Sequence, residues 1–225
     1  MELQKHNPNQ GVDLMNPDTF NQLQRAAKAF SSSTIVPKEY QGDQGLSNCI
    51  VAIDMALRMN LSPTMVMQNL YIVHGRPTWK AEFVISRLHS KYTDLDFEQD
   101  NQDGGRCRVV ATKADGTKVS GTWVSMNLAK SEGWASRNGS KWKTMPEQML
   151  MYRAATFFAR IYAPELLNGV ADQYEALDAP ESYARESADI QRLNDLAADA
   201  VQVDQDNQDD DPPMTMAEAL ADDID

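Results

Sequence analysis

The sequence lacks the signatures of most enzymes that act on nucleotides, peptides or esters. Its 225 residues contain no GxxxxGK[ST] phosphate-binding loop, no HExxH and no GxSxG. The three histidines, His6, His74 and His89, are scattered, and none stands at metal-ligand spacing from another. Asp94 and Asp96 could hold a metal, but two such carboxylates near the end of a strand are more often solvated. We therefore expect neither an ATP-driven motor nor a catalytic centre, and Mg²⁺ is compatible with the sequence without being indicated by it.

Cysteine and long apolar runs are also scarce. Cys49 and Cys107 are the two cysteines, and they lie far apart with no CxxC pair. This pattern offers no structural zinc site and fits a reducing, cytoplasmic location. Cys49 falls in an apolar helical pattern, which favours a buried, inert thiol over a nucleophile. No apolar run approaches the roughly 20 residues of a membrane span, and the N-terminal residues lack a signal-peptide pattern, so we expect no membrane association.

Charge is distributed unevenly along the chain, whose formal net charge is −12. Residues 1–166 contain 19 Lys and Arg against 16 Asp and Glu, a net +3, whereas residues 167–225 contain 2 against 17, a net −15. Within residues 104–163 the balance is 10 basic to 3 acidic, a net +7. A basic stretch followed by an acidic tail is the informative feature, because the global charge alone would argue against a nucleic-acid partner.

The periodicity of apolar residues predicts an α+β fold: a small antiparallel sheet with a β-hairpin, packed by several helices. Helices are expected at 16–30, 46–60, 63–69, 80–91 and 145–163, with a short helix from Ser125 to Gly133. Strands are expected at 71–73, 93–100, 106–113 and 117–124. We expect residues 1–170 to form a folded core and residues 171–225 an acidic, largely disordered tail.

Three capping signals support the expected helix starts. Asn16 is a candidate N-cap for the first helix, and Ser47 or Asn48 for the second. Thr144 and Glu147 have the spacing of a capping box at the start of the long last helix.

At the other end of the chain, "MTMAEALADDID" places three apolar side chains among acids. That segment is either a peptide that folds on a partner or a solubilising end.

Cationic and aromatic residues recur at three places in the core. The hairpin "LYIVHGRPTWK" supplies Arg76, Trp79 and Lys80, the loop "WASRNGSKWK" supplies Arg137, Lys141, Trp142 and Lys143, and the long helix supplies Arg153 and Arg160. Single-stranded nucleic acid is bound by this mixture, because cations follow the backbone while aromatic rings stack on bases of any identity. We predict that these nine residues line the two walls of one DNA groove.

The alternative is that the aromatic residues pack in the core and the cations form a solvated face. For the hairpin, a solvated turn over a core Trp79 explains the pattern as well. Trp123, in a strand, is expected in the core. For Trp134 and Trp142, which flank a Gly/Asn-rich loop, both alternatives stay open.

Two stretches carry a resemblance to a known family. "ALRMNLSPTMVMQNLYIVHGRPTWKAEFVISRL" and the later "W…KTMPEQMLMYRAATFFARIYAPELLNG", with "GTWVSM" between them, resemble the RecT family of phage and prophage single-strand annealing proteins. The similarity spans about residues 20–170. Where the family commonly has a Lys-Thr and a basic pair in the last helix, this chain has "RAATFFAR", in which Arg153 stands near the Lys and two phenylalanines replace the pair.

The resemblance implies a specific function. It implies ATP-independent binding and annealing of single-stranded DNA in homologous recombination, with the duplex product retained in a ring or helical homo-oligomer. A partner exonuclease and the host single-strand-binding protein are implied as further partners, and no cofactor is required.

Two other classes of function remain open: a passive single-strand-binding or replication-accessory module, and an interaction scaffold whose active part is the acidic tail. The tail is also expected to compete with DNA for the basic groove.

Overall fold

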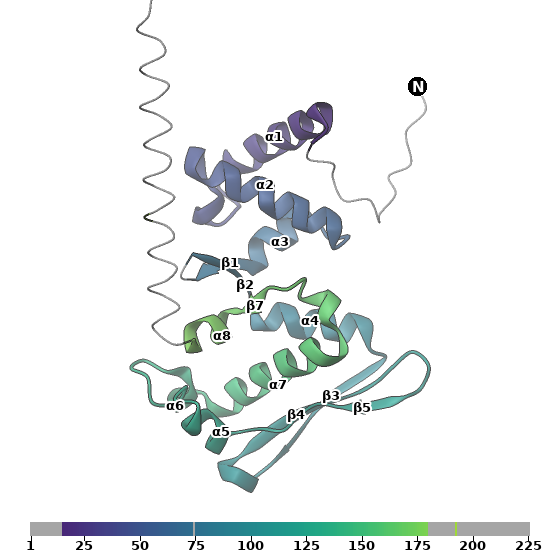
Figure 1. Cartoon of the computed structure of the whole chain (residues 1–225), viewed down its shortest axis with the longest axis vertical. Helices are drawn as coiled ribbons and strands as arrows, with labels where there is room; N and C mark the ends of the chain where they lie inside the picture. Colours follow the sequence, from purple (N-terminus) through teal and green to yellow (C-terminus); the bar gives the residue numbers. More distant parts are fainter. Residues whose placement is uncertain (1–14, 74, 180–191, 193–225) are drawn as a thin grey trace, which may run out of the picture. The chain divides into compact units, whose positions relative to one another are not determined.

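The computed structural model describes residues 15–73, 75–179 and 192, and it confirms the mixed α+β class with small antiparallel pairings (Figure 1). The described residues up to Ala179 belong to one compact unit. Of the predicted acidic tail at 171–225, residues 171–179 are described and form a short strand and a short helix, so that part of the prediction is wrong. The remainder of the tail and its predicted partner-binding end lie outside the described residues, apart from Arg192.

The first part of the chain is helical. It contains α1 (Pro17–Ser31), η1 (Lys38–Tyr40), α2 (Gly42–Arg58) and α3 (Pro63–Asn69). Asn16 caps α1 as predicted, since its side chain accepts from the backbone N–H groups of Asp18 and Thr19. Helix α2 begins four residues earlier than expected, and the prediction that Ser47 or Asn48 caps it is wrong. Both residues lie inside the helix, and Asn48 instead donates to the backbone oxygen of Glu39 at 2.7 Å.

A close backbone approach explains where α2 begins. At Gly45 an added Cβ would lie 2.2 Å from the carbonyl carbon of Tyr40, so only glycine lets the helix pass this close to η1. Tyr40 is buried there, and its hydroxyl donates to the backbone oxygen of Leu70 at 3.1 Å. The start of α2 is therefore set by packing and not by a capping side chain.

The hairpin forms as predicted, and a third strand from later in the chain pairs with it. β1 (Leu70–Val73) and β2 (Arg76–Trp79) pair antiparallel, with Leu70 opposite Trp79. β7 (Ala171–Asp172) pairs parallel with β2, with Asp172 opposite Trp79. Helix α8 (Gln173–Asp178) follows β7 directly, and Asp172 forms a full capping box at its start. The ordered unit therefore runs to Ala179, nine residues beyond the predicted core boundary at 170.

A second sheet contains β3 (Asp94–Asp100), β4 (Arg106–Thr112), β5 (Lys118–Ser120) and β6 (Val124–Ser125). All of its pairings are antiparallel, with β4 between β3 and β5 and with β6 also on β4. The strand predicted at 117–124 is divided into β5 and β6 because the chain bends at Gly121. There the backbone N–H donates to Val109, and a Cβ would lie 3.2 Å from the Phe158 ring.

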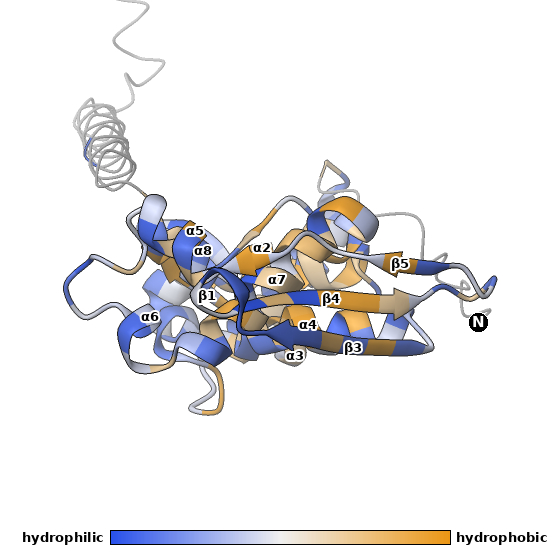
Figure 2. Ribbon diagram, turned by 90° about the horizontal axis from the view of Figure 1, so that it is seen from below, coloured by the Kyte–Doolittle hydropathy of each residue, from blue (hydrophilic) through white to orange (hydrophobic). Residues whose placement is uncertain are grey.

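One face of this sheet is covered by helices and the other is open. Cys107, Val109 and Ala111 point from β4 into the core, where α7 (Pro146–Tyr162) packs across the strand and α4 (Ala81–Lys91) lies beside α7 (Figure 1). In Figure 2, seen from below, β3 and β4 lie in front of these helices, and much of β3 is coloured hydrophilic. Burial raises the pKa of both cysteine thiols, that of Cys107 to about 11, which agrees with inert thiols.

The connection between the sheet and α7 contains two short helices. These are α5 (Met126–Ser131), capped by Ser125 as predicted, and α6 (Lys141–Thr144) within the predicted loop. The predicted capping box at Thr144 and Glu147 is wrong. Thr144 ends α6, and Met145 precedes α7 without any side-chain cap, because Pro146 opens that helix. The segments η2 (Gln102–Gly104) and η3 (Pro164–Leu166) complete the order of elements.

Within the described ranges, no single helix has both the length and the apolar character of a membrane span. The α2–α3 pair meets those criteria only jointly, and it bends by 115° at its break.

Candidate nucleic-acid interface

The hairpin presents its cations at the surface and its tryptophan to the core. Trp79 is fully buried, its indole N–H donates to the backbone oxygen of Leu167 at 3.0 Å, and its ring lies 4.8 Å from that of Phe83. In this conformation Trp79 is a core residue and offers no face to a base. Arg76 is exposed, and Lys80 is half-buried with its ammonium group 5.0 Å from the centre of the Tyr71 ring.

The loop before α7 folds around a second buried tryptophan. Trp142 is 1% exposed, its ring lies 5.4 Å from that of Trp134, and its indole N–H donates to Asp178 at 3.0 Å. Of the two alternatives for these rings, stacking on bases or packing in the protein, the structure shows packing. Trp142 is buried and Trp134 is half-buried. Lys141 and Lys143, which flank Trp142 in the sequence, are both exposed.

The two arginines of α7 are both paired with acids. Arg153 is 5% exposed, its guanidinium lies 4.1 Å above the Trp134 ring, and it forms ion pairs with Asp178 and, at 3.6 Å, with Glu175. Arg160, seven residues later on the same face, pairs with Glu175 at 2.7 Å. The sequence spacing correctly grouped these arginines, but it did not show that carboxylates from α8 occupy them.

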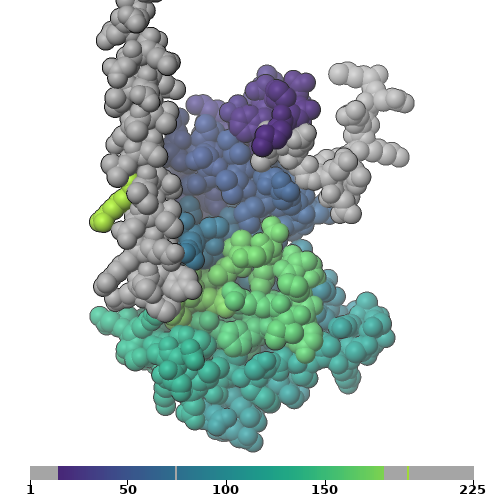
Figure 3. All heavy atoms as spheres, in the orientation of Figure 1, coloured from purple at the N-terminus to yellow at the C-terminus, as the bar shows by residue number. Residues whose placement is uncertain are grey.

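Helix α8 contacts two of the segments that were predicted to line the groove. It contacts β1 and β2 of the hairpin on one side, and its acids reach α7 on the other. The guanidinium of Arg137, from the loop, donates to the backbone oxygen of Leu177. In Figures 1 and 3 the green segment that follows α7 lies between the blue N-terminal helices and the teal sheet region. Helix α8 therefore contacts segments that were assigned to both walls, and the DNA groove itself stays a prediction.

Burial of α8 carboxylates changes their proton affinity. Desolvation raises the pKa of Glu175 from 4.5 to about 7, nearby Asp172 raises it further, and Arg160 and Arg153 oppose the shift. Desolvation also raises the pKa of Asp178, against the hydrogen bond from Trp142 and the charge of Arg153. The acids on α8 are thus held in positions where their ionised forms are less favourable than in water.

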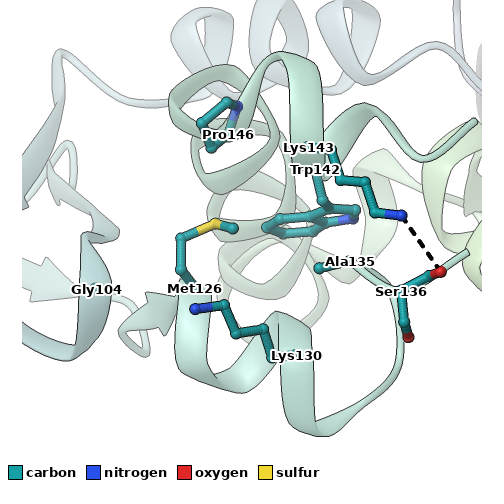
Figure 4. Close-up of a pocket in the computed structure, with 8 residues that line it drawn as sticks. All are labelled: Gly104, Met126, Lys130, Ala135, Ser136, Trp142, Lys143 and Pro146. Atoms are coloured by element: carbon teal, nitrogen blue, oxygen red, sulfur yellow. Dashed lines mark hydrogen bonds between the residues drawn. The ribbon is translucent and has the colours of Figure 1, made fainter.

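An open pocket of about 580 Å³ lies on the other side of Trp142. Its wall is mostly apolar, and two ammonium groups stand beside it, Lys130 from α5 and Lys143 from α6 (Figure 4). The lining residues are Gly104, Met126, Lys130, Ala135, Ser136, Trp142, Lys143 and Pro146. The ammonium group of Lys143 contacts the backbone oxygens of Ser136 and Arg137 at 3.5 and 3.3 Å.

Two exposed lysines, Lys130 and Lys143, therefore line this pocket, and a third, Lys141, is exposed on α6 next to Trp142 in the sequence. We call Lys130, Lys141 and Lys143 the lysine cluster. Among the described residues, none of the three forms an ion pair with a carboxylate. Sequence reasoning missed Lys130 because it lies on the short helix α5, outside the three segments in which cations and aromatic residues recur. The only signal that includes it is the net +7 of residues 104–163.

The open face of the second sheet carries a further cationic and aromatic group. Trp123, predicted in the core, is half-buried, and the guanidinium groups of Arg106 and Arg108 lie 4.2 and 4.6 Å from its ring. Both arginines also pair with acids directly across the strands, Arg106 with Asp100 at 2.8 Å and Arg108 with Glu98 at 2.6 Å. The two arginines of this face are therefore paired with acids of the same sheet, whereas the lysine cluster has no carboxylate partner among the described residues.

No cluster of three or more metal-ligating side chains occurs in the ranges that the structure describes, and Asp94 and Asp96 lie exposed on β3.

Comparison with known proteins gives no match to a protein-family model, to a curated protein or to a solved structure.

Proposed function

We propose that this chain binds single-stranded DNA and promotes annealing of complementary strands without a nucleotide cofactor. The observation that carries the proposal is the lysine cluster: three exposed lysines that have no carboxylate partner among the described residues, two of which line a pocket with a mostly apolar wall. Ammonium groups that have no carboxylate partner are available to phosphates, and binding through them releases counterions from the strand. Their contacts carry no sequence information, as sequence-independent binding requires.

Annealing requires more than binding. A protein that holds the phosphate backbone through cations on one side leaves the base edges free for Watson–Crick pairing. The burial of Trp79 and Trp142, which are 0% and 1% exposed, favours this backbone-directed mode over one in which these two rings stack on bases. In this proposal the complementary strand supplies all of the base recognition, and the protein supplies proximity and charge neutralisation.

The partners belong to the same proposal. The resemblance to the RecT family supports a ring or helical homo-oligomer that retains the duplex product, together with an exonuclease that creates the single strand and contact with the host single-strand-binding protein. It also supports recombination of phage-type DNA in the cytoplasm of a bacterial host. No bond-making or bond-breaking chemistry is proposed, and neither ATP nor a metal ion is required.

The test mixes two complementary dye-labelled oligonucleotides with the full chain in the absence of nucleotide. An annealing protein shortens the half-time of pairing, whereas a passive single-strand-binding module binds both strands and leaves the half-time unchanged or longer. An interaction scaffold that acts through its acidic tail binds neither strand. Pairing at the spontaneous rate with folded protein would refute the annealing function.

A further inference from the structure

Helix α8 offers the basic residues of the groove the same chemistry as a DNA backbone. Asp178 accepts from the Arg153 guanidinium and from the Trp142 indole N–H, and Glu175 accepts from Arg160 at 2.7 Å. A carboxylate and a phosphate present guanidinium groups with equivalent charged oxygen acceptors. Of the nine residues that sequence spacing predicts to bind DNA, four are thus contacted by α8: Arg137, Trp142, Arg153 and Arg160.

The attachment of α8 is firm at its start and weak at its end. Asp172 is 1% exposed and accepts from the Thr156 hydroxyl at 2.8 Å, and Tyr174 stacks on Tyr152 with ring centres 5.3 Å apart. Beyond these anchors the helix has only one more turn, and Leu177, its largest apolar side chain there, is 50% exposed. The last turn is therefore held chiefly by its charged and polar contacts, in which a DNA phosphate can take the place of a carboxylate.

Because these acids are buried, the free energy that holds the end of α8 against α7 is small. Removing carboxylates and guanidinium groups from water is unfavourable, and their mutual attraction offsets that loss only in part. The raised pKa of Glu175, for which desolvation is the largest cause, agrees with this imbalance. The chain then continues from Ala179 into residues 180–225, which hold 14 Asp and Glu against 2 Lys and Arg, a net −12 that phosphates would repel.

We infer that α8 is an autoinhibitory segment that competes in cis with single-stranded DNA. Phosphates displace Glu175 and Asp178 from the basic residues of α7 and the preceding loop, while Asp172 keeps the segment attached to β2. Displacement joins these arginines to the lysine cluster as one continuous binding surface. This inference rests on the proposed function, since it assigns the regulation of the same site.

The first experiment compares two double variants of the full chain that change net charge equally. Glu175→Gln/Asp178→Asn weakens the α8 contacts, and Asp94→Asn/Asp96→Asn removes two exposed acids from β3 as the matched control. Binding of a fluorescein-labelled oligothymidylate of about 30 nucleotides is followed by anisotropy at low salt. We expect the α8 variant to bind about tenfold tighter than wild type and the control less than about threefold tighter. Equal effects of the two variants would overturn the inference, because net charge would then explain both.

The second experiment needs no variant and so does not depend on its folding. Amide hydrogen exchange of wild-type protein is measured with and without the same oligothymidylate. We expect the amides of α8 to exchange faster when DNA is bound, whereas those of α7 stay protected. Unchanged or slower exchange in α8 would contradict displacement. If wild type binds and anneals DNA but both experiments fail, only the autoinhibition falls; if neither wild type nor the α8 variant binds, the proposed function falls with it.

Discussion

The lysine cluster makes a quantitative prediction about salt. The triple variant Lys130→Ala/Lys141→Ala/Lys143→Ala removes three ammonium groups that we propose contact phosphates. Each contact on a single strand contributes about 0.7 to the slope of log K against log salt concentration, so the variant should lose roughly 2 units of slope. Over a fourfold change, from about 0.05 to about 0.2 M salt, wild-type affinity should fall roughly 20-fold more than that of the variant.

Anisotropy titrations of a labelled oligothymidylate at several salt concentrations measure this slope directly. The matched control is Lys38→Ala/Lys113→Ala/Lys118→Ala, which removes three exposed lysines from other parts of the described surface. Because all six side chains are exposed, neither variant should change the free energy of unfolding by more than about 0.5 kcal/mol per substitution. An unchanged slope in the first variant, or an equal loss in the control, would refute the assignment of the site.

Three further predictions concern the scaffold and α8. Trp79→Ala should lower the free energy of unfolding by about 3–5 kcal/mol in urea titrations, because a fully buried ring is lost; a loss below about 1 kcal/mol would contradict its core position. Gly45→Ala should destabilise by more than about 1 kcal/mol because its Cβ would meet the Tyr40 backbone, and an unchanged urea midpoint would contradict that contact. The pKa of Glu175, raised to about 7 from 4.5, favours the folded state below pH 4.5, and this contribution is lost as pH rises to about 7. It amounts to about 3 kcal/mol at most, so Glu175→Gln should flatten the pH dependence of the urea midpoint in this window, and an equally steep dependence would refute the shift.

Most of the fold follows from local patterns in the sequence. Apolar spacing on α1, α4 and α7 and the alternation in β3 and β4 each determine which face is buried, so these elements were predicted well. The start of α2 was missed because it depends on the contact between Gly45 and Tyr40, which no local pattern contains. Helix α8 was missed because its acids resemble a tail by composition. Its ion pairs join residues that lie 22 and 25 positions apart, Glu175 and Asp178 with Arg153.

The candidate site was predicted in part. Helical spacing grouped the arginines of α7, and the composition of the loop before it singled out Lys141 and Lys143, which are exposed. The exposure of the tryptophans could not be predicted, because distant segments decide it. Leu167 accepts from Trp79 and Asp178 from Trp142, and both acceptors come from residues near or beyond the end of the region that carries the family resemblance.

Photocrosslinking tests the central claim most directly. An oligonucleotide that contains a photoreactive pyrimidine is bound to the full chain and irradiated, and the crosslinked peptides are identified by mass spectrometry. The account predicts crosslinks in the segment from Met126 to Pro146, with loss of those crosslinks in the lysine-cluster triple variant. Crosslinks confined to the open face of β3, β4 and β5, or a pattern that the triple variant leaves unchanged, would contradict it.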